Sequence, residues 1–193
     1  MKLLRKVDSI EVKRCFVISD FIAKQKNIDK EFLNKLNKTK DIILGLPETM
    51  LDKFIKGAWK KRLRSYNTLK WYVGIATIDE IGVWKWAGDL PVSWTRGSLE
   101  ETAYLVEHAL KENSQKTTKR FQTTIPRILK NSLNMIQKEK YLLPIIIPGG
   151  VIRKGLKRMK GDIDDGCMRS IALALSGKKV IKAYIGVRKK NKS

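Results

Sequence analysis

The chain has 193 residues, of which 41 are Lys or Arg and 19 are Asp or Glu, so its formal net charge at pH 7 is +22. This length suits one domain with its own core, and 42% apolar residues with five Trp exclude a wholly disordered basic chain. So large a positive excess makes DNA or RNA the expected partner, although a lysine-rich proteome would give the same charge.

Targeting and metal signals are missing from the sequence. The first ten residues, MKLLRKVDSI, lack the apolar run of a secretory signal, and the longest apolar stretch, 141–148, is too short to cross a bilayer. Cys15 and Cys167 do not make a disulfide framework, and a single His leaves no usual set of zinc ligands. We therefore expect a soluble cytoplasmic protein with no membrane partner and no structural metal.

Residues 1–65 are expected to form a basic helical N-terminal extension. Apolar residues recur at helical spacing over 29–44, and Gly45 and Pro47 end that segment. A second apolar stripe, from Leu51 to Trp59, predicts another helix with lysines on its outer face. The extension could contact nucleic acid, pack on the main domain or form a homodimer.

Residues 66–188 are expected to form the main domain, an α/β (α+β) unit, followed by a basic tail at 189–193. Apolar residues alternate over 69–75, and a second β-rich run follows at 81–86 after a short connection. These two runs predict a β-hairpin.

Helices and strands then alternate along the rest of the domain. Ser98 and Glu101 have the spacing of a capping box and predict the start of a helix, and a further helix is predicted over 126–137. Continuous apolar runs at 141–147 and 180–187 predict two buried strands.

The stretch GDIDDGCMRSIALALSG, residues 161–177, places three aspartates before a short apolar helix. A Gly at a helix start lets a ligand approach the backbone, and the free N–H groups of the first turn favour an anion. Gly166 and Arg169 are therefore candidate phosphate ligands, with Arg169 able to grip a phosphate through two bonds. The alternative is that Asp165 is an N-cap and Arg169 is a surface residue.

The charged residues before this helix suggest two further sites. Asp162 and Asp164 should face the same side of a strand, with Asp165 at its end, and converging carboxylates beside a phosphate suit Mg²⁺. The alternative is a charged turn that balances nearby cations. Five basic residues are expected on a hairpin that tracks a nucleic-acid backbone, namely Arg153, Lys154, Lys157, Arg158 and Lys160.

The segment PIIIPGG…DIDDGCMRSIALALSGKKVIKAYIGV resembles the core of the ParB/sulfiredoxin fold, in which a strand and a Gly-x-x-Arg type box lead into a short helix and a strand. Partition proteins have Gly-Glu-Arg-Arg there, sulfiredoxins have Gly-Gly-Cys-His-Arg, and ADP-dependent serine kinases have Asp-Gly-His-His-Arg. This chain has Asp-Gly-Cys-Met-Arg at 165–169. The resemblance covers about residues 140–188 and implies a ParB/sulfiredoxin-like mixed sheet with flanking helices.

The resemblance also implies a site that binds a nucleotide such as ATP, ADP or CTP together with Mg²⁺. In such a site Gly166 and Arg169 would bind the phosphates, and Asp165 would match the catalytic acidic residue of the kinase-like members. Arg96 and Glu100 would approach the nucleotide from an earlier strand.

Cys167 falls where sulfiredoxins keep their catalytic thiol. A thiol at a helix N-terminus has a lowered pKa and is a candidate nucleophile. Met168 departs from the family pattern, which has His there, and a charge of +22 is not expected of a sulfinic acid reductase. The alternative is that Cys167 is a small packing residue.

Three tryptophans could stack on bases or belong to the core, namely Trp84, Trp86 and Trp94.

Together these features lead to three hypotheses. The first is a DNA-binding ParB-like protein of viral or plasmid origin whose phosphate site works as a nucleotide-dependent switch or hydrolyses phosphate esters, as an NTPase or a nuclease. The second is a phosphotransferase that uses ATP or ADP to modify a small hydroxyl compound or a nucleotide. The third is a nucleic-acid-binding module without catalysis.

Overall fold

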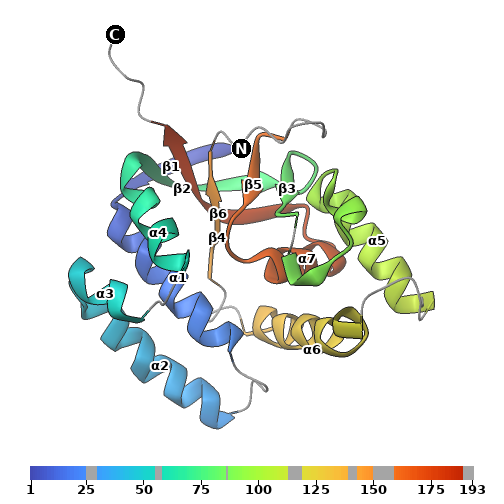
Figure 1. Cartoon of the computed structure of the whole chain (residues 1–193), viewed down its shortest axis with the longest axis horizontal. Helices are drawn as coiled ribbons and strands as arrows, with labels where there is room; N and C mark the ends of the chain where they lie inside the picture. The colour runs from blue at the N-terminus through green and yellow to red at the C-terminus, as the bar shows by residue number, and fades with distance from the viewer. Residues whose placement is uncertain are drawn as a thin grey trace.

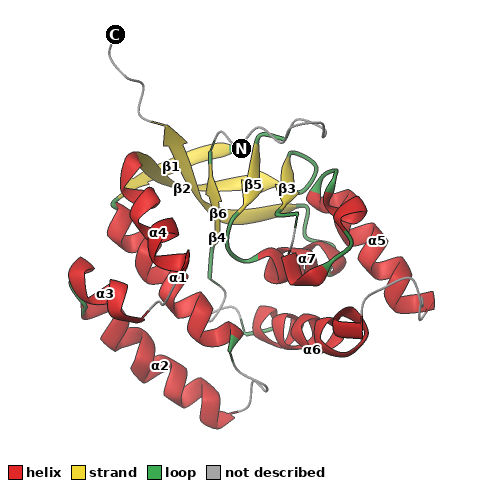
Figure 2. Ribbon diagram, viewed as in Figure 1, coloured by secondary structure: helices red, strands yellow, loops and turns green. Residues whose placement is uncertain are grey.

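The computed structural model describes residues 1–24, 30–54, 58–85, 87–112, 119–138, 143–149 and 159–188. At its centre is a four-stranded sheet in the order β1-β2-β6-β4 (Figures 1 and 2). The neighbours β1–β2 and β2–β6 are antiparallel, whereas β4 and β6 are parallel. The strands are β1 (Lys2–Val7), β2 (Leu69–Thr77), β4 (Ile145–Pro148) and β6 (Val180–Arg188). The fold is therefore mixed α/β, as the sequence predicted.

A small parallel sheet joins β3 (Ile81–Val83) to β5 (Gly161–Ile163). The predicted hairpin between 69–75 and 81–86 is therefore wrong, because β2 pairs with β1 and β6 while β3 pairs with a strand about eighty positions further along the chain. The end of β5 is tied to the main sheet, since Asp165 forms a bridge with Ile146 of β4. This bridge places the aspartate-rich segment beside the centre of the fold.

The first strand differs from the helical extension expected for residues 1–65. β1 pairs along the edge of the main sheet, and its first five residues are exposed. Because they are exposed on both faces, the sequence KLLRKV has no alternation that would reveal a strand. Its lysines and arginine suit an edge strand, where charge opposes unwanted pairing.

Helices cover both faces of the sheet (Figure 2). On one side lie α1 (Ser9–Ala23), α2 (Lys30–Gly45), α3 (Glu48–Phe54) and α4 (Ala58–Ser65). On the other side lie α5 (Leu99–Glu112), α6 (Lys119–Ile136) and α7 (Cys167–Leu175). No described helix is both long and apolar enough to cross a membrane.

The strands supply side chains to both cores. Ile145 and Ile147 of β4 pack with the helices α5–α7, whereas Ile146 packs with the N-terminal helices. Successive side chains of a strand point to opposite faces, so a continuous apolar run serves a sheet that is covered on both sides. This confirms the expectation of a buried strand before the aspartate-rich segment.

Several local signals in the sequence are confirmed. The Glu101 backbone N–H donates to Ser98 Oγ at 3.1 Å, and the Ser98 N–H donates to Glu101 Oε2 at 2.8 Å, which completes the capping box. Gly177 follows α7 with a φ of 84°, as a helix-ending glycine does. The helix α6 starts seven residues before the predicted Pro126, because Phe121 and Ile125 extend its buried stripe.

Candidate functional site

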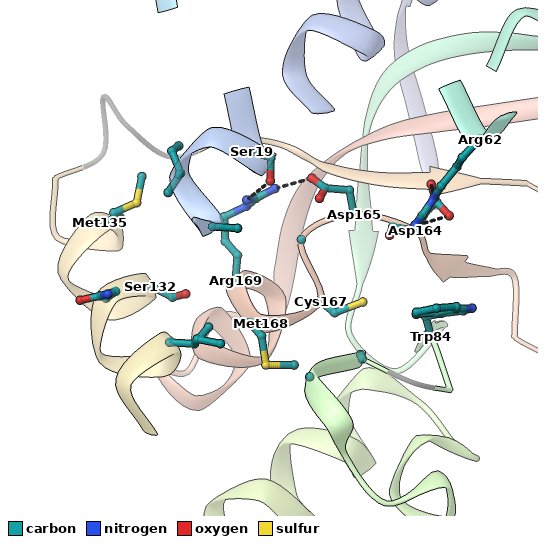
Figure 3. A pocket seen from close by; sticks show the side chains of 17 residues that line it. Ser19, Arg62, Trp84, Ser132, Met135, Asp164, Asp165, Cys167, Met168 and Arg169 are labelled. Carbon is teal, nitrogen blue, oxygen red and sulfur yellow. Dashed lines mark hydrogen bonds and ion pairs between the residues drawn. The ribbon is translucent and has the colours of Figure 1, made fainter. Parts of the chain in front are cut away.

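A cavity of about 360 Å³ lies against α1, α6 and the N-terminus of α7 (Figure 3). The segment 164–169 forms one wall, and Ile128, Ser132 and Met135 of α6 form another. Arg62 of α4 and Trp84, which follows β3, also line the cavity, together with residues at the end of α1. The cavity is therefore built by segments that are far apart in the sequence.

The turn into α7 depends on a glycine. Gly166 has a φ of 92°, and a Cβ atom there would lie 2.6 Å from Arg169 Nη2 and 2.9 Å from Ile145 Cγ2. The backbone before it is fixed to β4, because the Asp164 N–H donates to the Ile146 carbonyl at 2.8 Å and the Ile146 N–H donates to the Asp165 carbonyl at 3.0 Å. The two aspartates therefore stand at defined positions beside the cavity.

Arg169 is part of the cavity wall, and its guanidinium contacts three segments of the chain. Its Nη1 donates to Ser19 Oγ of α1 at 3.3 Å, and its Nη2 donates to the Pro144 carbonyl at 3.1 Å, just before β4. Nη2 also lies 3.5 Å from Asp165 Oδ2, and only 12% of the Arg169 side chain is exposed. The guanidinium is thus occupied by protein groups, which does not favour its predicted role as a phosphate ligand.

Asp165 is the carboxylate that compensates this arginine. Burial raises the pKa of Asp165, and the charge of Arg169 opposes that rise. It lines the cavity, and its predicted role as a catalytic acid or base stays a prediction. Its described partners, however, are side chains of the fold itself.

Asp164 belongs to a second network, with Arg62 and Tyr66. Tyr66 Oη donates to Asp164 Oδ2 at 2.5 Å. Arg62 donates to the same carboxylate through Nε and Nη2, and also to the Asp164 carbonyl. Burial, followed by the adjacent Asp164 charge, raises the pKa of Tyr66, so the phenol stays protonated and remains a donor.

Arg62 also lies between aromatic rings. Its guanidinium carbon is 5.7 Å from the ring centroid of Phe16 and 5.8 Å from that of Trp84, within the range of cation–π attraction. Trp84 is 38% exposed, so one part of its indole faces solvent. Arg62 and Trp84, which we call the rim pair, place an aromatic surface and a positive charge together at the cavity (Figure 3).

Cys167 lines the cavity, but its thiol is not activated. Burial raises the pKa of Cys167 to about 12, and Sγ lies 3.5 Å from the Ile163 carbonyl, to which the S–H donates. The sequence-based expectation of a lowered pKa is therefore corrected: loss of solvation outweighs the field of the helix N-terminus. A thiol that stays protonated at neutral pH is a poor nucleophile.

The predicted magnesium ligands do not converge. Asp162 lies on β5, is 8% exposed and is not part of the cavity lining, whereas Asp164 is held by Arg62 and Tyr66. Among the described residues, no group of three or more His, Cys, Asp or Glu lies together as metal ligands would. Asp162 and Asp164 therefore do not form the shared ligand set that was predicted for them, and Mg²⁺ binding stays a prediction.

Arg96 and Glu100 do not reach the cavity. They line a separate surface depression with Trp94 and Tyr104 at the start of α5. Glu100 Oε1 pairs with Lys179 Nζ at 2.7 Å. Their predicted approach to the cavity is therefore corrected, because both residues line this other depression and neither belongs to the cavity lining.

Four residues of the predicted basic hairpin, Arg153, Lys154, Lys157 and Arg158, lie outside the described residues, as does Trp86. Lys160 is described, and its Nζ donates to Glu80 Oε2 at 2.6 Å. Asp164 pairs with Arg62, which is 102 positions away, and Asp165 with Arg169, four positions away, whereas Lys160 pairs with Glu80. The alternative of a charged turn that balances the basic residues of 153–160 stays a prediction, because four of those residues lie outside the described part of the chain.

Sequence reasoning missed Arg62, Tyr66 and Ser19. Arg62 and Asp164 are 102 positions apart, and Ser19 and Arg169 are 150 positions apart, so no local pattern links them. One signal was available: Ser19 is a polar residue inside the apolar run CFVISDFIA, and it is 6% exposed. A hydroxyl buried in an apolar helix face predicts a buried polar partner.

No protein-family model, curated protein or solved structure matches the chain. The ParB/sulfiredoxin resemblance therefore stays a prediction from residues 140–188.

Proposed function

We propose that the protein binds nucleic acid through its basic surface and holds one nucleoside unit in the cavity between α1, α6 and α7. The observation that carries this proposal is the rim pair, Arg62 and Trp84, beside a cavity of about 360 Å³ in a chain of charge +22. Exposed indoles that stack on bases, combined with lysines and arginines that follow the phosphates, are the usual means of binding single strands.

The size and surroundings of the cavity support this proposal. Its volume is at the lower end of the ~300–1,000 Å³ range of small-molecule sites. Exposed Lys60 and Lys61 precede Arg62 on α4, and exposed Lys85 follows Trp84, so positive charge flanks the rim pair in the sequence. Such residues would contact phosphates while the cavity holds the nucleoside.

The site supports binding more than it supports phosphoryl transfer. Cys167 is protonated, Arg169 is engaged with Ser19 and Pro144, and the described carboxylates do not gather around a metal position. A nucleic-acid-binding protein with a nucleoside site agrees better with these contacts than a kinase or a hydrolase does.

Fluorescence anisotropy with labelled single-stranded DNA, single-stranded RNA and duplex DNA tests the proposal. We expect binding whose affinity falls steeply with salt, since released counterions drive the phosphate contacts. Trp84→Leu should weaken single-strand binding by about tenfold, in line with ~1–3 kcal/mol for one stacked base. The matched control is Tyr104→Leu, an aromatic that is 64% exposed and outside the cavity lining. Equal affinities of wild type and Trp84→Leu would contradict a role for the cavity.

A further inference from the structure

The charged side chains of the cavity cancel one another. Among its described lining residues the charged groups are two arginines and two aspartates, and each arginine has its own carboxylate. A phosphate group carries nearly two negative charges and would have to displace a carboxylate that is held in place. The α7 N-terminus contributes only about half a positive charge, and Asp165 already stands there.

The remaining walls are apolar and suit a flat ring. Ile22 lines the cavity from α1, Ile128 and Met135 from α6, and Met168 from α7. In Figure 3 the Met135 and Met168 side chains approach from two sides of the cavity. Thioethers are polarizable and pack favourably on aromatic rings, and a hydrophobic lining with few polar groups is typical of sites for uncharged ligands.

The polar groups of the lining are suited to the edge of such a ring. Asn131 and Ser132 of α6 carry both donor and acceptor atoms, whereas an anion would need donors alone. A nucleobase is flat, uncharged and carries donors and acceptors on its edge. Trp84 adds an exposed aromatic face at the cavity.

From this balance of charge and lining, we infer that the cavity recognises the nucleobase itself, while the phosphates stay outside on the basic surface. The inference rests on the proposed function. A phosphate site at α7 would place the phosphate of a nucleotide inside the cavity, whereas here the base lies inside and the phosphate outside. The base comes either from a free nucleoside or from one position of a strand, and both present the same ring to the cavity.

Isothermal titration calorimetry with small probes tests this orientation. The probes are the four common nucleosides, their 5′-monophosphates, ribose 5-phosphate and inorganic phosphate, at a physiological ionic strength of about 0.15 M. We expect at least one nucleoside to bind, with its monophosphate within about threefold in affinity, which corresponds to about 0.65 kcal/mol. Ribose 5-phosphate and inorganic phosphate should not compete.

Two variants locate the binding. Trp84→Leu should weaken nucleoside binding by about tenfold or more. Tyr104→Leu should leave it unchanged, and thermal unfolding of both variants separates lost binding from lost structure. A short oligonucleotide that competes with the nucleoside identifies a strand as the source of the base, and one that binds without competing identifies a free nucleoside.

The outcomes separate the inference from the proposed function. A monophosphate that binds more than about tenfold tighter than its nucleoside, with competition by inorganic phosphate, overturns the inference and leaves the nucleotide site standing. Oligonucleotide binding without any nucleoside binding also overturns it and restricts the protein to surface contacts. No binding of nucleosides, nucleotides or oligonucleotides overturns the proposed function as well.

Discussion

Asp164 and Asp165 are neighbours in the sequence, each faces an arginine, and the two pairs lie in different surroundings. The Asp165–Arg169 pair is closed, because the arginine also donates to Ser19 and to the Pro144 carbonyl. The Asp164–Arg62 pair adjoins the exposed indole of Trp84. The comparison teaches that both pairs join distant parts of the fold and are similarly buried, with 17% of Arg62 and 12% of Arg169 exposed. They differ in their neighbours, since Arg62 lies beside the exposed indole of Trp84 and Arg169 lies beside Ser19 and the Pro144 carbonyl.

Loss of the Asp165–Arg169 pair should have the largest effect on the free energy of unfolding. Arg169→Met should lower the free energy of unfolding by about 3–5 kcal/mol, because Asp165 would stay buried without its partner. Urea denaturation followed by circular dichroism measures it. The control is Arg127→Met on the exposed face of α6, expected to change stability by less than about 0.5 kcal/mol. A loss below about 1 kcal/mol for Arg169→Met would mean that the arginine is free for a ligand.

A substitution at Gly166, in the turn that leads into α7, should have the next largest effect on the free energy of unfolding. Gly166→Ala combines backbone strain at a φ of 92° with a Cβ that lies 2.6 Å from Arg169 Nη2, so we expect a loss of about 2–4 kcal/mol. Gly177→Ala isolates the strain, because its φ is 84° and nothing lies within 4 Å of the added Cβ. The same urea titration should show a smaller loss for Gly177→Ala, and equal losses would argue against close packing at Gly166.

Loss of the Asp164–Arg62 ion pair should affect ligand preference more than stability. Asp164→Asn keeps an acceptor for Tyr66 but removes the charge that holds Arg62, with a stability loss of about 1–3 kcal/mol. The freed guanidinium should raise the affinity of the cavity for a nucleoside monophosphate relative to its nucleoside. Calorimetry with both ligands measures the ratio. An unchanged ratio would show that Arg62 does not face the ligand.

An ion pair outside the cavity provides an effect on stability that depends on pH, with no effect expected on ligand binding. Burial alone would raise the pKa of Glu80, but hydrogen bonds from Lys160, from the N-terminal amine and from the Thr77 N–H lower it from 4.5 to about 2. A depressed pKa stabilises the folded protein above about pH 4.5, and this contribution disappears as the pH falls towards 2.

Glu80→Gln should therefore lower Tm at neutral pH, and its Tm should approach that of the wild type between about pH 4.5 and pH 2. Differential scanning calorimetry over that range measures the difference. Nucleoside affinity at neutral pH should not change, because Glu80 is not part of the cavity lining. A Tm difference that is constant with pH would contradict this account of Glu80.

Short sequence patterns correctly predicted features that depend on neighbouring residues, such as helix ends and a buried strand. The capping box of Ser98 and Glu101, the glycine that ends α7 and the buried strand β4 follow from short-range chemistry or from runs of apolar residues, and each is confirmed. The motif residues 164–169 were also found, and they do line one cavity.

Contacts between segments that are far apart in the chain could not be predicted from the sequence. The parallel pairing of β3 with β5 and the contact of Arg62 with Asp164 join segments about eighty to one hundred positions apart. No turn or periodicity encodes such contacts, and the edge strand β1 has no alternation of its own. The burial that raises the pKa of Cys167 and the place of Arg96 and Glu100 in a separate depression could not be predicted for the same reason, since both depend on the tertiary fold.

The most direct test of a base-binding cavity compares two single strands of equal length, one with bases and one made of abasic deoxyribose phosphates. Both keep the phosphates, so the basic surface contacts both alike. We predict that the abasic strand binds wild type at least about tenfold more weakly, and that Trp84→Leu reduces this difference. Equal affinity of the two strands for wild type would show that phosphates alone are recognised and would contradict the account.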